Sequence, residues 1–307
     1  MSEKIYDMVI IGAGVTGLTA AIYASRAGLN LLLIEQGAPG GQILNTYEVD
    51  NYTGISDVSG FELAQKFKNH AEALGVKPLL AAVTEIDTTE KIKKVITSKG
   101  TYETKTVVMA TGGKWSELGL ESEQKYKGRG VSYCATCDGA FFKNKITVVN
   151  GGGDVAVEDA IYLARFAKKV YLVHRRDTLR AQKVLQDNLF KTENIEIIWD
   201  SEIEEILGDA LVTGVKLKNK KTGETSELKT DGVFIAIGTT ANSELVADKV
   251  DCDSKGNIIA DESGVTSLPG LFAAGDVRTK AVKQIITGAS DGANVVYSVE
   301  QYILRNF

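Results

Sequence analysis

The stretch MVIIGAGVTG, residues 8–17, decides the fold of the N-terminal part of this chain. It opens with four apolar residues in a row, which is typical of a strand buried in a parallel sheet. A glycine-rich turn follows, and residues 18–27, rich in Ala and Leu, predict a helix. A second apolar run at 31–34 predicts another buried strand and ends at Glu35. This order of strand, turn, helix and strand is that of a βαβ unit that binds a dinucleotide.

Each glycine of this turn has its own task in such a unit. Gly12 permits the tight turn, Gly14 lets a pyrophosphate approach the backbone, and Gly17 lets helix and strand pack closely. The free N–H groups at the start of the helix face the phosphates. Glu35 can accept hydrogen bonds from ribose hydroxyls, so we expect a dinucleotide with a free 2′-hydroxyl here.

The same arrangement recurs in the middle of the chain. An apolar strand is predicted at 146–149, and the turn GGGDVA at 151–156 fits the pattern GxGxxA. A helix is predicted at 157–166 and a second strand at 170–173. The chain therefore contains two dinucleotide-binding units.

The two units differ in charge at the end of their second strand. The second unit has His174, Arg175 and Arg176 there, with Arg180 shortly after, where the first unit has Glu35. An acid at this corner would repel a 2′-phosphate, whereas arginines bind it through paired hydrogen bonds. The second unit is therefore predicted to hold NADPH, and a solvated basic edge is the alternative reading of the same residues.

Length and charge restrict the classes of protein. The 307 residues are enough for two domains, and the net charge of −5 gives no broad basic surface. This balance argues against nucleic acid or an anionic membrane as the main partner. The segment at 1–7 is charged and leads directly into the first strand, so we expect no signal peptide. The apolar runs are too short to span a bilayer, and the expected location is the cytoplasm.

The chain has three cysteines, of which Cys134 and Cys137 are separated by two residues and Cys252 is distant. A close pair in a reducing compartment is more often catalytic or metal-binding than structural. A zinc site normally needs four ligands, and Cys252, His70 and His174 supply no second pair. An inert buried pair is the other alternative. A two-residue loop lets the sulfurs bond and a helix start favours a thiolate, so the pair is predicted to be redox-active rather than either alternative.

The motif CATCDG at 134–139, between two dinucleotide units and followed by GDVR at 275–278, resembles the low-molecular-weight thioredoxin reductases of bacteria. The resemblance covers essentially the whole chain. Other matching segments lie at 39–42, 48–51, 110–112, 130–133 and 283–285.

The resemblance implies an α/β fold of two Rossmann-like domains, each a three-layer ββα arrangement, with the NADPH domain inserted into the FAD domain. The chain is expected to cross between the domains near 112–115 and near 238–242. The FAD domain would then be discontinuous, at 1–114 and 243–307, and the NADPH domain with the CATC motif would occupy 115–242. Two adjacent crossings would form a hinge.

The resemblance also implies the cofactor contacts. It assigns FAD to Gly12, Gly14, Gly17, Glu35, Gln36, Gly41, Gln42, Asn51, Val83, Thr111, Gly112, Gly275, Asp276, Lys283, Gln284 and Ile285. It assigns NADPH to Gly151, Gly153, Asp154, Val155, Ala156, Glu158, His174, Arg175, Arg176, Arg180 and Gly238. No metal site is expected. Val155 stands where similar proteins commonly have Ser or Thr, and Asn150 stands where they have an apolar residue.

In similar enzymes the second cysteine of the motif touches the flavin and the first attacks a partner disulfide. This assigns the flavin side to Cys137 and the exchange with thioredoxin to Cys134, with Asp138 as proton donor. The resemblance further implies a homodimer and a large rotation between domains.

Other functions remain to be weighed against thioredoxin-disulfide reduction. A flavoenzyme that oxidises thiols with O₂ or a ferredoxin-driven reductase would not need the basic corner at 174–180. A ferredoxin:NADP reductase would not need the CATC motif. A redox-sensing or NADPH-binding module without catalysis would keep the nucleotide turns but would not need the thiols.

Overall fold

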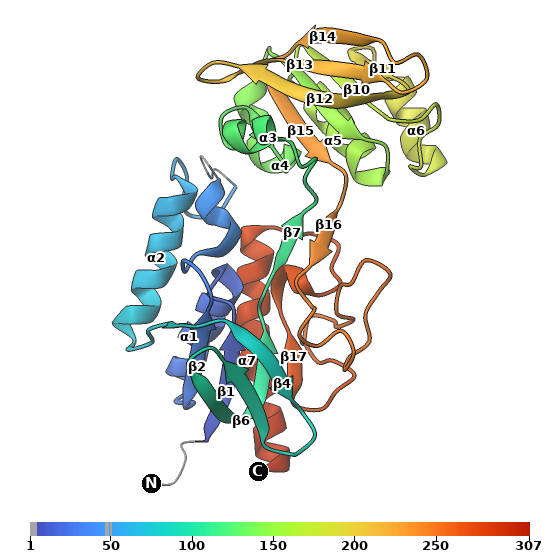
Figure 1. The fold of residues 1–307 in the computed structure, drawn as a ribbon. Helices are drawn as coiled ribbons and strands as arrows, with labels where there is room; N and C mark the ends of the chain where they lie inside the picture. The colour runs from blue at the N-terminus through green and yellow to red at the C-terminus, as the bar shows by residue number, and fades with distance from the viewer. Residues whose placement is uncertain (1–4, 47–48, 50) are drawn as a thin grey trace. The chain divides into compact units, whose positions relative to one another are not determined.

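The structure is a computed structural model that describes residues 5–46, 49 and 51–307. The N-terminal residues 1–4, and Glu48 and Asp50 of the 48–51 segment, lie outside the described residues. The chain forms two compact units, Met1–Lys114 with Thr240–Phe307, and Trp115–Thr239 (Figure 1). The second crossing thus falls at 239/240, three residues before the expected 242/243. The connecting segments β7 (Gly113–Trp115) and β16 (Thr239–Ala241) pair with each other in a two-stranded sheet.

The described part of the first unit contains a seven-stranded sheet in the order β3-β2-β1-β6-β5-β4, with β17 paired to β6. The neighbours β2 and β6 run parallel to β1, and β17 runs parallel to β6, whereas β4 and β5 form an antiparallel extension. The strands are β1 (Tyr6–Ile11), β2 (Leu31–Glu35), β3 (Leu79–Leu80), β4 (Val83–Asp87), β5 (Lys93–Thr97), β6 (Gly100–Met109) and β17 (Leu271–Ala273). The helices are α1 (Val15–Arg26), α2 (Gly60–Ala73) and α7 (Ile285–Asn306), with the 3-10 helices η1 (Gly41–Asn45) and η3 (Gly275–Val277).

Strand β1 separates two hydrophobic cores, because successive side chains of a strand point to opposite faces. Met8 and Ile10 pack with the apolar faces of α1 and α7, which lie side by side (Figure 1). Val9 and Ile11 pack instead with β4, β5 and the segment 245–277. A helical layer therefore covers one face of β1, whereas the antiparallel extension β4–β5 and the segment 245–277 pack against its other face.

The second unit repeats this plan. Its parallel sheet has the order β11-β10-β9-β15-β8, and a separate antiparallel sheet has the order β12-β13-β14. The strands are β8 (Val131–Ser132), β9 (Ile146–Gly151), β10 (Lys169–Val173), β11 (Ile195–Ile198), β12 (Ser201–Gly208), β13 (Val212–Asn219), β14 (Thr225–Lys229) and β15 (Gly232–Ala236). The helices are α3 (Glu121–Tyr126), α4 (Ala135–Asp138), α5 (Asp154–Ala164) and α6 (Lys183–Phe190), with the 3-10 helix η2 (Gly139–Phe142).

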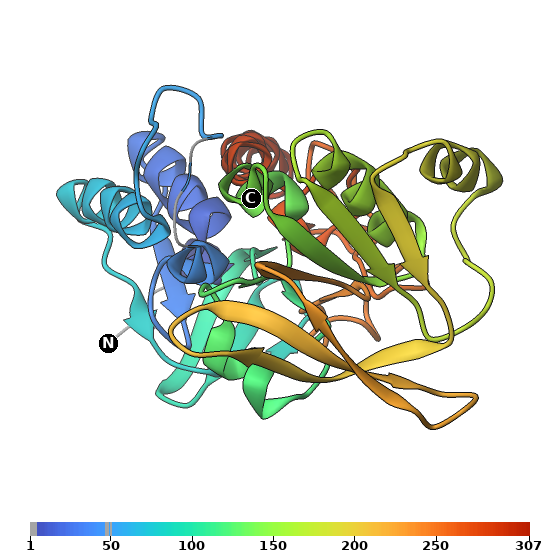
Figure 2. The same ribbon diagram turned by 90° about the horizontal axis from the view of Figure 1, so that it is seen from above.

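The parallel sheet of the second unit also lies between two different layers. Val149, Leu172 and Phe234 pack against the apolar face of α5. Val148 and Val233 belong to the core on the opposite face, which includes residues of β12 and β13. In Figure 2 the antiparallel strands β12–β14 lie on one side of the sheet and helix α5 on the other. The predicted α/β class with Rossmann-like parallel sheets is confirmed.

Candidate functional site

The first glycine-rich turn joins the end of β1 to the start of α1. Gly12 has a φ of +104°, which residues with side chains rarely adopt, and its N–H donates to the Ile34 carbonyl at 2.8 Å. A Cβ on Gly17 would lie 1.8 Å from the Gly12 carbonyl oxygen, so only glycine lets α1 approach the turn this closely. A Cβ on Gly14 would instead have the Gly41 Cα as its nearest neighbour, at 3.8 Å. The open space at Gly14 fits a pyrophosphate lying against the backbone.

Glu35 ends β2 and its carboxylate reaches across to the turn. One oxygen accepts the N–H of Ala13 at 2.7 Å and the other accepts the N–H of Gly37 at 2.8 Å. These bonds fix the carboxylate at the edge of the turn, and each oxygen retains a lone pair for a further donor. Gln36 follows as an exposed residue. The arrangement is compatible with a ribose whose hydroxyls donate to Glu35.

Other residues predicted to bind FAD lie at the same edge of the sheet, because parallel strands share the edge at which they end. Thr111 and Gly112 follow β6, and Gly275 and Asp276 follow β17. Asn242 joins the first pair to the C-terminal part of the unit: its carbonyl accepts the Thr111 hydroxyl at 2.6 Å, and its N–H donates to the Gly112 carbonyl at 3.0 Å.

The remaining predicted FAD residues come from four other segments of the first unit. The Asn51 amide donates to the Gln284 side-chain oxygen at 3.2 Å, and the Gln42 amide donates to the Gly113 carbonyl. Gly41 begins η1 with a φ of +65°. Val83 and Ile285 begin β4 and α7. All predicted FAD residues thus belong to one compact unit.

Two charged groups at this edge are half-buried. Burial raises the pKa of the Asp276 carboxyl, and the ammonium groups of Lys280 and Lys283 partly oppose this. Burial likewise lowers the pKa of Lys283, whose ammonium donates to the Asn257 side chain at 2.8 Å and to the Asp276 carbonyl at 3.0 Å. Perturbed ionisable groups at a strand edge are typical of ligand sites.

An ion pair that was not predicted from the sequence supports this edge. Arg278 and Asp291 form two hydrogen bonds of 2.7 and 2.8 Å, and both side chains are 6% exposed. Asp291 also accepts the N–H of Gly275 at 2.8 Å and the ammonium of Lys280 at 3.2 Å. The pair therefore holds the segment that carries Asp276. The sequence signal for this pair was Asp291 itself, a charged residue within the mostly small and apolar stretch 288–296.

The second glycine-rich turn joins β9 to α5. As in the first turn, one glycine is required by packing and another leaves open space beside the backbone. A Cβ on Gly151 would lie 2.4 Å from the Ala236 carbonyl oxygen, so this glycine is required by packing. No atom lies within 4 Å of a Cβ built on Gly153, which is the N-cap of α5. Ala156 is fully buried beneath the turn. The free backbone at Gly153 fits a phosphate group.

The basic corner follows β10 and is tied to this turn. The Arg180 N–H donates to the Gly152 carbonyl at 2.7 Å, and the buried His174 ring contacts the Thr178 carbonyl at 3.0 Å. Burial lowers the pKa of His174, which favours its neutral form. Arg175, Arg176 and Arg180 are exposed, and no described carboxylate forms a salt bridge with them. Exposed guanidinium groups without acidic partners fit an anionic ligand.

The other residues predicted for NADPH have mixed surroundings. The Asp154 carboxylate accepts the Gln182 N–H at 2.7 Å and so ties the starts of α5 and α6 together. Val155 is 51% exposed in the first turn of α5, without a hydroxyl to offer a phosphate. Glu158 is exposed one turn further along the helix, and Gly238 has a φ of +120° before the crossing into β16.

Cys134 and Cys137 form a disulfide in the second unit, with Cα atoms 5.3 Å apart. Both are half-buried, and Cys134 is the N-cap of the short helix α4. The bonded and accessible state fits a redox-active pair better than a zinc site or an inert pair. Cys252 is a free thiol whose pKa is raised by burial and by the flanking Asp251 and Asp253, which makes it a poorer nucleophile.

The residues around the pair are joined by hydrogen bonds. The Ser132 hydroxyl lies 2.6 Å from an Asp138 carboxylate oxygen. The Tyr133 hydroxyl donates to Glu123 at 2.7 Å, and the Tyr133 ring stacks on Trp115 with centroids 6.4 Å apart. Glu123 is fully buried and also accepts backbone N–H groups of residues 118–120. This network fixes the backbone that leads into Cys134.

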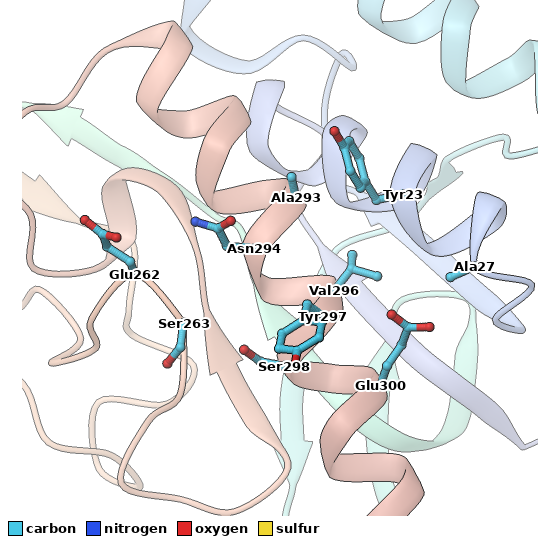
Figure 3. A pocket seen from close by; sticks show the side chains of 10 residues that line it. All are labelled: Tyr23, Ala27, Glu262, Ser263, Ala293, Asn294, Val296, Tyr297, Ser298 and Glu300. Carbon is cyan, nitrogen blue, oxygen red and sulfur yellow. The ribbon is translucent and has the colours of Figure 1, made fainter.

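A metal site within residues 5–46, 49 and 51–307 would need several ligating side chains close together. No three His, Cys, Asp or Glu side chains in that part of the chain are grouped so that they could hold a metal ion. None of its helices is long and apolar enough to cross a bilayer. A pocket of about 660 Å³ lies beside α1 and α7 and is lined by none of the predicted cofactor residues (Figure 3).

Comparisons with known proteins show the family to which the chain belongs. The family model for pyridine nucleotide-disulphide oxidoreductases matches residues 6–292. The chain is 46% identical to the thioredoxin reductase of Listeria monocytogenes over 98% of this chain and 95% of that protein, and 44% identical to that of Bacillus subtilis over 98% and 96%. The crystal structure of thioredoxin reductase from Streptococcus pyogenes superimposes with a TM-score of 0.94, at 47% identity, over 99% of this chain and 100% of that one. The chain therefore belongs to the pyridine nucleotide-disulphide oxidoreductase family, among its thioredoxin reductases.

Proposed function

We propose that this protein is an NADPH-dependent, FAD-containing thioredoxin-disulfide reductase. The observation that carries the proposal is the Cys134–Cys137 disulfide, half-buried at the start of α4 and followed directly by Asp138, which is hydrogen-bonded to Ser132. It lies in a chain with two dinucleotide turns, each of which leaves one glycine open to a ligand. Electrons would pass from NADPH to FAD, then to this disulfide and finally to the disulfide of thioredoxin.

We assign FAD to the first unit and NADPH to the second. The first unit presents Glu35 where a ribose would need an acceptor, whereas the second presents Arg175, Arg176 and Arg180 where a 2′-phosphate would need donors. A bound flavin supplies the chemistry that converts hydride transfer into reduction of a disulfide. The residues of the chain orient the nucleotides, and Asp138 holds the proton that a newly formed thiol requires.

The thiol roles follow from the same proposal. Cys137 is assigned to the flavin side and Cys134 to exchange with thioredoxin. A thiolate of Cys134 attacks the thioredoxin disulfide and forms a mixed disulfide, which Cys137 then resolves, so that the Cys134–Cys137 bond is restored and thioredoxin leaves as a dithiol. A half-buried N-cap position suits Cys134, since a helix start favours a thiolate.

The test separates the two halves of the reaction. Purified protein should be yellow, NADPH should bleach its flavin band without oxygen, and thioredoxin should be reduced at the expense of NADPH. Cys134→Ser should retain the bleaching and lose thioredoxin reduction, while Cys252→Ser should behave as the parent protein. Colourless protein, or a parent protein that bleaches but never reduces thioredoxin, would contradict the proposal. The exposed arginines disfavour an O₂-linked thiol oxidase, which needs no nicotinamide cofactor.

We further propose a cytoplasmic homodimer. Large apolar side chains are exposed around the pocket beside α1 and α7, where Tyr23 is 49% and Tyr297 is 66% exposed (Figure 3). We assign this surface to a second copy of the chain, because exposed aromatic rings grouped at one site are typical of interfaces. Sedimentation analysis should give a dimer, and Tyr297→Glu should weaken it. A monomeric parent protein would contradict this assignment.

A further inference from the structure

Ser132 is a buried hydroxyl that connects the parallel sheet of the second unit to the redox motif. It is 5% exposed and lies on β8, where it pairs with Phe234 of β15. Its oxygen lies 2.6 Å from an Asp138 carboxylate oxygen, at the last residue of α4. It also accepts the N–H of Cys134 at 3.1 Å. A side chain held on a strand thus contacts both ends of the CATCD segment.

The surroundings of this hydroxyl suit both protonation states of Asp138. When Asp138 is a carboxylate, Ser132 donates to it, and a bond of 2.6 Å is of the length expected for a charged acceptor. When Asp138 is protonated on its other carboxyl oxygen, Oδ2 can still accept the Ser132 proton, so the acidic proton on Oδ1 is not donated to the serine. The serine can therefore remain bonded when Asp138 gives up its proton.

We propose that Ser132 is a positioning residue: its hydrogen bond orients the Asp138 carboxyl group so that this group can transfer a proton to the Cys134–Cys137 pair. This proposal rests on the proposed function. Opening the disulfide takes up two electrons, supplied through the reduced cofactor, and two protons. Asp138 transfers one proton to a sulfur as the S–H bond forms, and becomes a carboxylate that Ser132 stabilises; solvent supplies the other.

Other titratable groups lie near α4 and determine the form of the test. Helix α5 packs against α4 and carries Asp154, Glu158, Asp159 and Tyr162, whereas η2 carries no titratable side chain. A change in the pH profile could arise from any of them. Variants are therefore compared at a single pH, through kcat, KM and a double-mutant cycle.

The experiment uses the full-length holoenzyme with thioredoxin as substrate. Ser132→Ala should lower kcat by about tenfold, with KM for thioredoxin within about twofold of the parent value, because a bond to a charged group in the proton-transfer step is lost. Bleaching of the flavin band by NADPH should be unchanged. Ser132→Thr should restore kcat and Ser132→Val should not, since these two side chains have nearly the same shape and differ in the hydroxyl.

A double-mutant cycle tests whether Ser132 acts through Asp138. In an Asp138→Asn background, Ser132→Ala should cause no further loss of kcat. Ser201→Ala is the matched control: Ser201 is also 5% exposed in the second unit and donates to the Trp199 carbonyl at 2.8 Å. This control should have the kcat of the parent enzyme.

Several results would overturn the proposal. These are a Ser132→Ala enzyme with normal kcat, a rise in KM alone, equal activity of the Thr and Val variants, or an undiminished loss in the Asp138→Asn background. Should the alanine variant fold poorly, the Thr and Val pair still decides. Failure of the proposed function is distinguishable, because the parent enzyme itself would then fail to reduce thioredoxin.

Discussion

At the scale of single residues, the preference for a nucleotide depends on a few exposed charges. Arg175 and Arg176 follow the end of β10 and form no salt bridge with an acidic side chain among the described residues. The backbone of Arg180 is hydrogen-bonded to the second glycine-rich turn. The backbone bond to Gly152 fixes where this basic corner lies relative to the phosphate turn. The guanidinium groups can then act as a clamp for a 2′-phosphate, the group that distinguishes NADPH from NADH.

Replacing Arg175 and Arg176 together by Ala should raise KM for NADPH by about 10- to 100-fold and leave KM for NADH nearly unchanged, because only NADPH loses paired hydrogen bonds to phosphate. Steady-state kinetics with both nucleotides measure this directly. Arg165→Ala, an exposed arginine at the end of α5, serves as control. Equal effects on the two nucleotides would show that these arginines do not read the 2′-phosphate.

At the scale of elements, two glycines at the start of α1 have different functions: one is required by packing and the other leaves space for a ligand. A Cβ at Gly17 meets the Gly12 carbonyl at 1.8 Å, whereas a Cβ at Gly14 meets only the Gly41 Cα at 3.8 Å. The two glycines lie within one turn of the same helix. Helix α1 is therefore pressed against the turn at one point and leaves room for a ligand at another.

Gly17→Ala should destabilise the protein by about 3 kcal/mol or more, since backbone must move to admit the methyl group. For Gly14→Ala, the unfolding free energy of the flavin-free protein should stay within about 1 kcal/mol of the parent value. The same variant should lose most of its affinity for FAD, because the methyl group occupies the space beside the backbone. Denaturant unfolding of flavin-free protein and titration with FAD measure the two effects. Equal loss of stability in both variants would remove the distinction.

Helix α5 carries a pH-sensitive carboxyl. Burial, the larger cause, and repulsion from Glu158, the smaller, raise the pKa of Asp159 from 3.8 to about 7. Because the folded state holds this proton more tightly than the unfolded state, its contribution to stability is present below pH 3.8 and is lost as the pH rises toward 7.

Asp159→Asn should therefore stabilise the protein by about 2 to 4 kcal/mol near pH 8, an amount reduced by partial hydration of the carboxylate, and should have much less effect near pH 5. Denaturant unfolding at the two pH values checks the sign. A variant with the same advantage at both values would show that Asp159 titrates normally in the folded protein.

At the scale of the whole molecule, one unit is inserted into the other. The chain leaves the first unit at Lys114 and returns at Thr240, and β7 and β16 pair at the crossing. On the first-unit side, the Asn242 N–H donates to the Gly112 carbonyl at 3.0 Å, so the two ends of the interrupted unit are adjacent. An insertion with adjacent ends can be removed without separating the parts of the outer unit.

Deleting residues 115–239 and joining Lys114 to Thr240 through a short glycine-serine linker should leave a protein that unfolds cooperatively and binds FAD. It should no longer be reduced efficiently by NADPH, because the second turn and the basic corner are gone. Calorimetry and flavin absorbance measure these properties. A folded protein without affinity for FAD would contradict our assignment of that cofactor to the first unit.

The sequence by itself determined the local features of this protein. Both βαβ units, the opposite charges at Glu35 and at 174–176, and the closely spaced cysteines are patterns of residues near one another in the chain. Their meaning follows from strand periodicity, from the conformations open to glycine and from the reach of a short loop. The α/β class and the position of the redox pair could therefore be predicted.

Only the tertiary structure decided which distant segments meet. The Arg278–Asp291 pair beneath the Gly275 turn and the contact of Asn51 with Gln284 were not predicted. The bond between Ser132 and Asp138 was missed although the two are close in sequence, because it joins a strand to the end of a helix. Such contacts depend on how elements pack, and packing reflects the shape of the whole core, which no local pattern encodes.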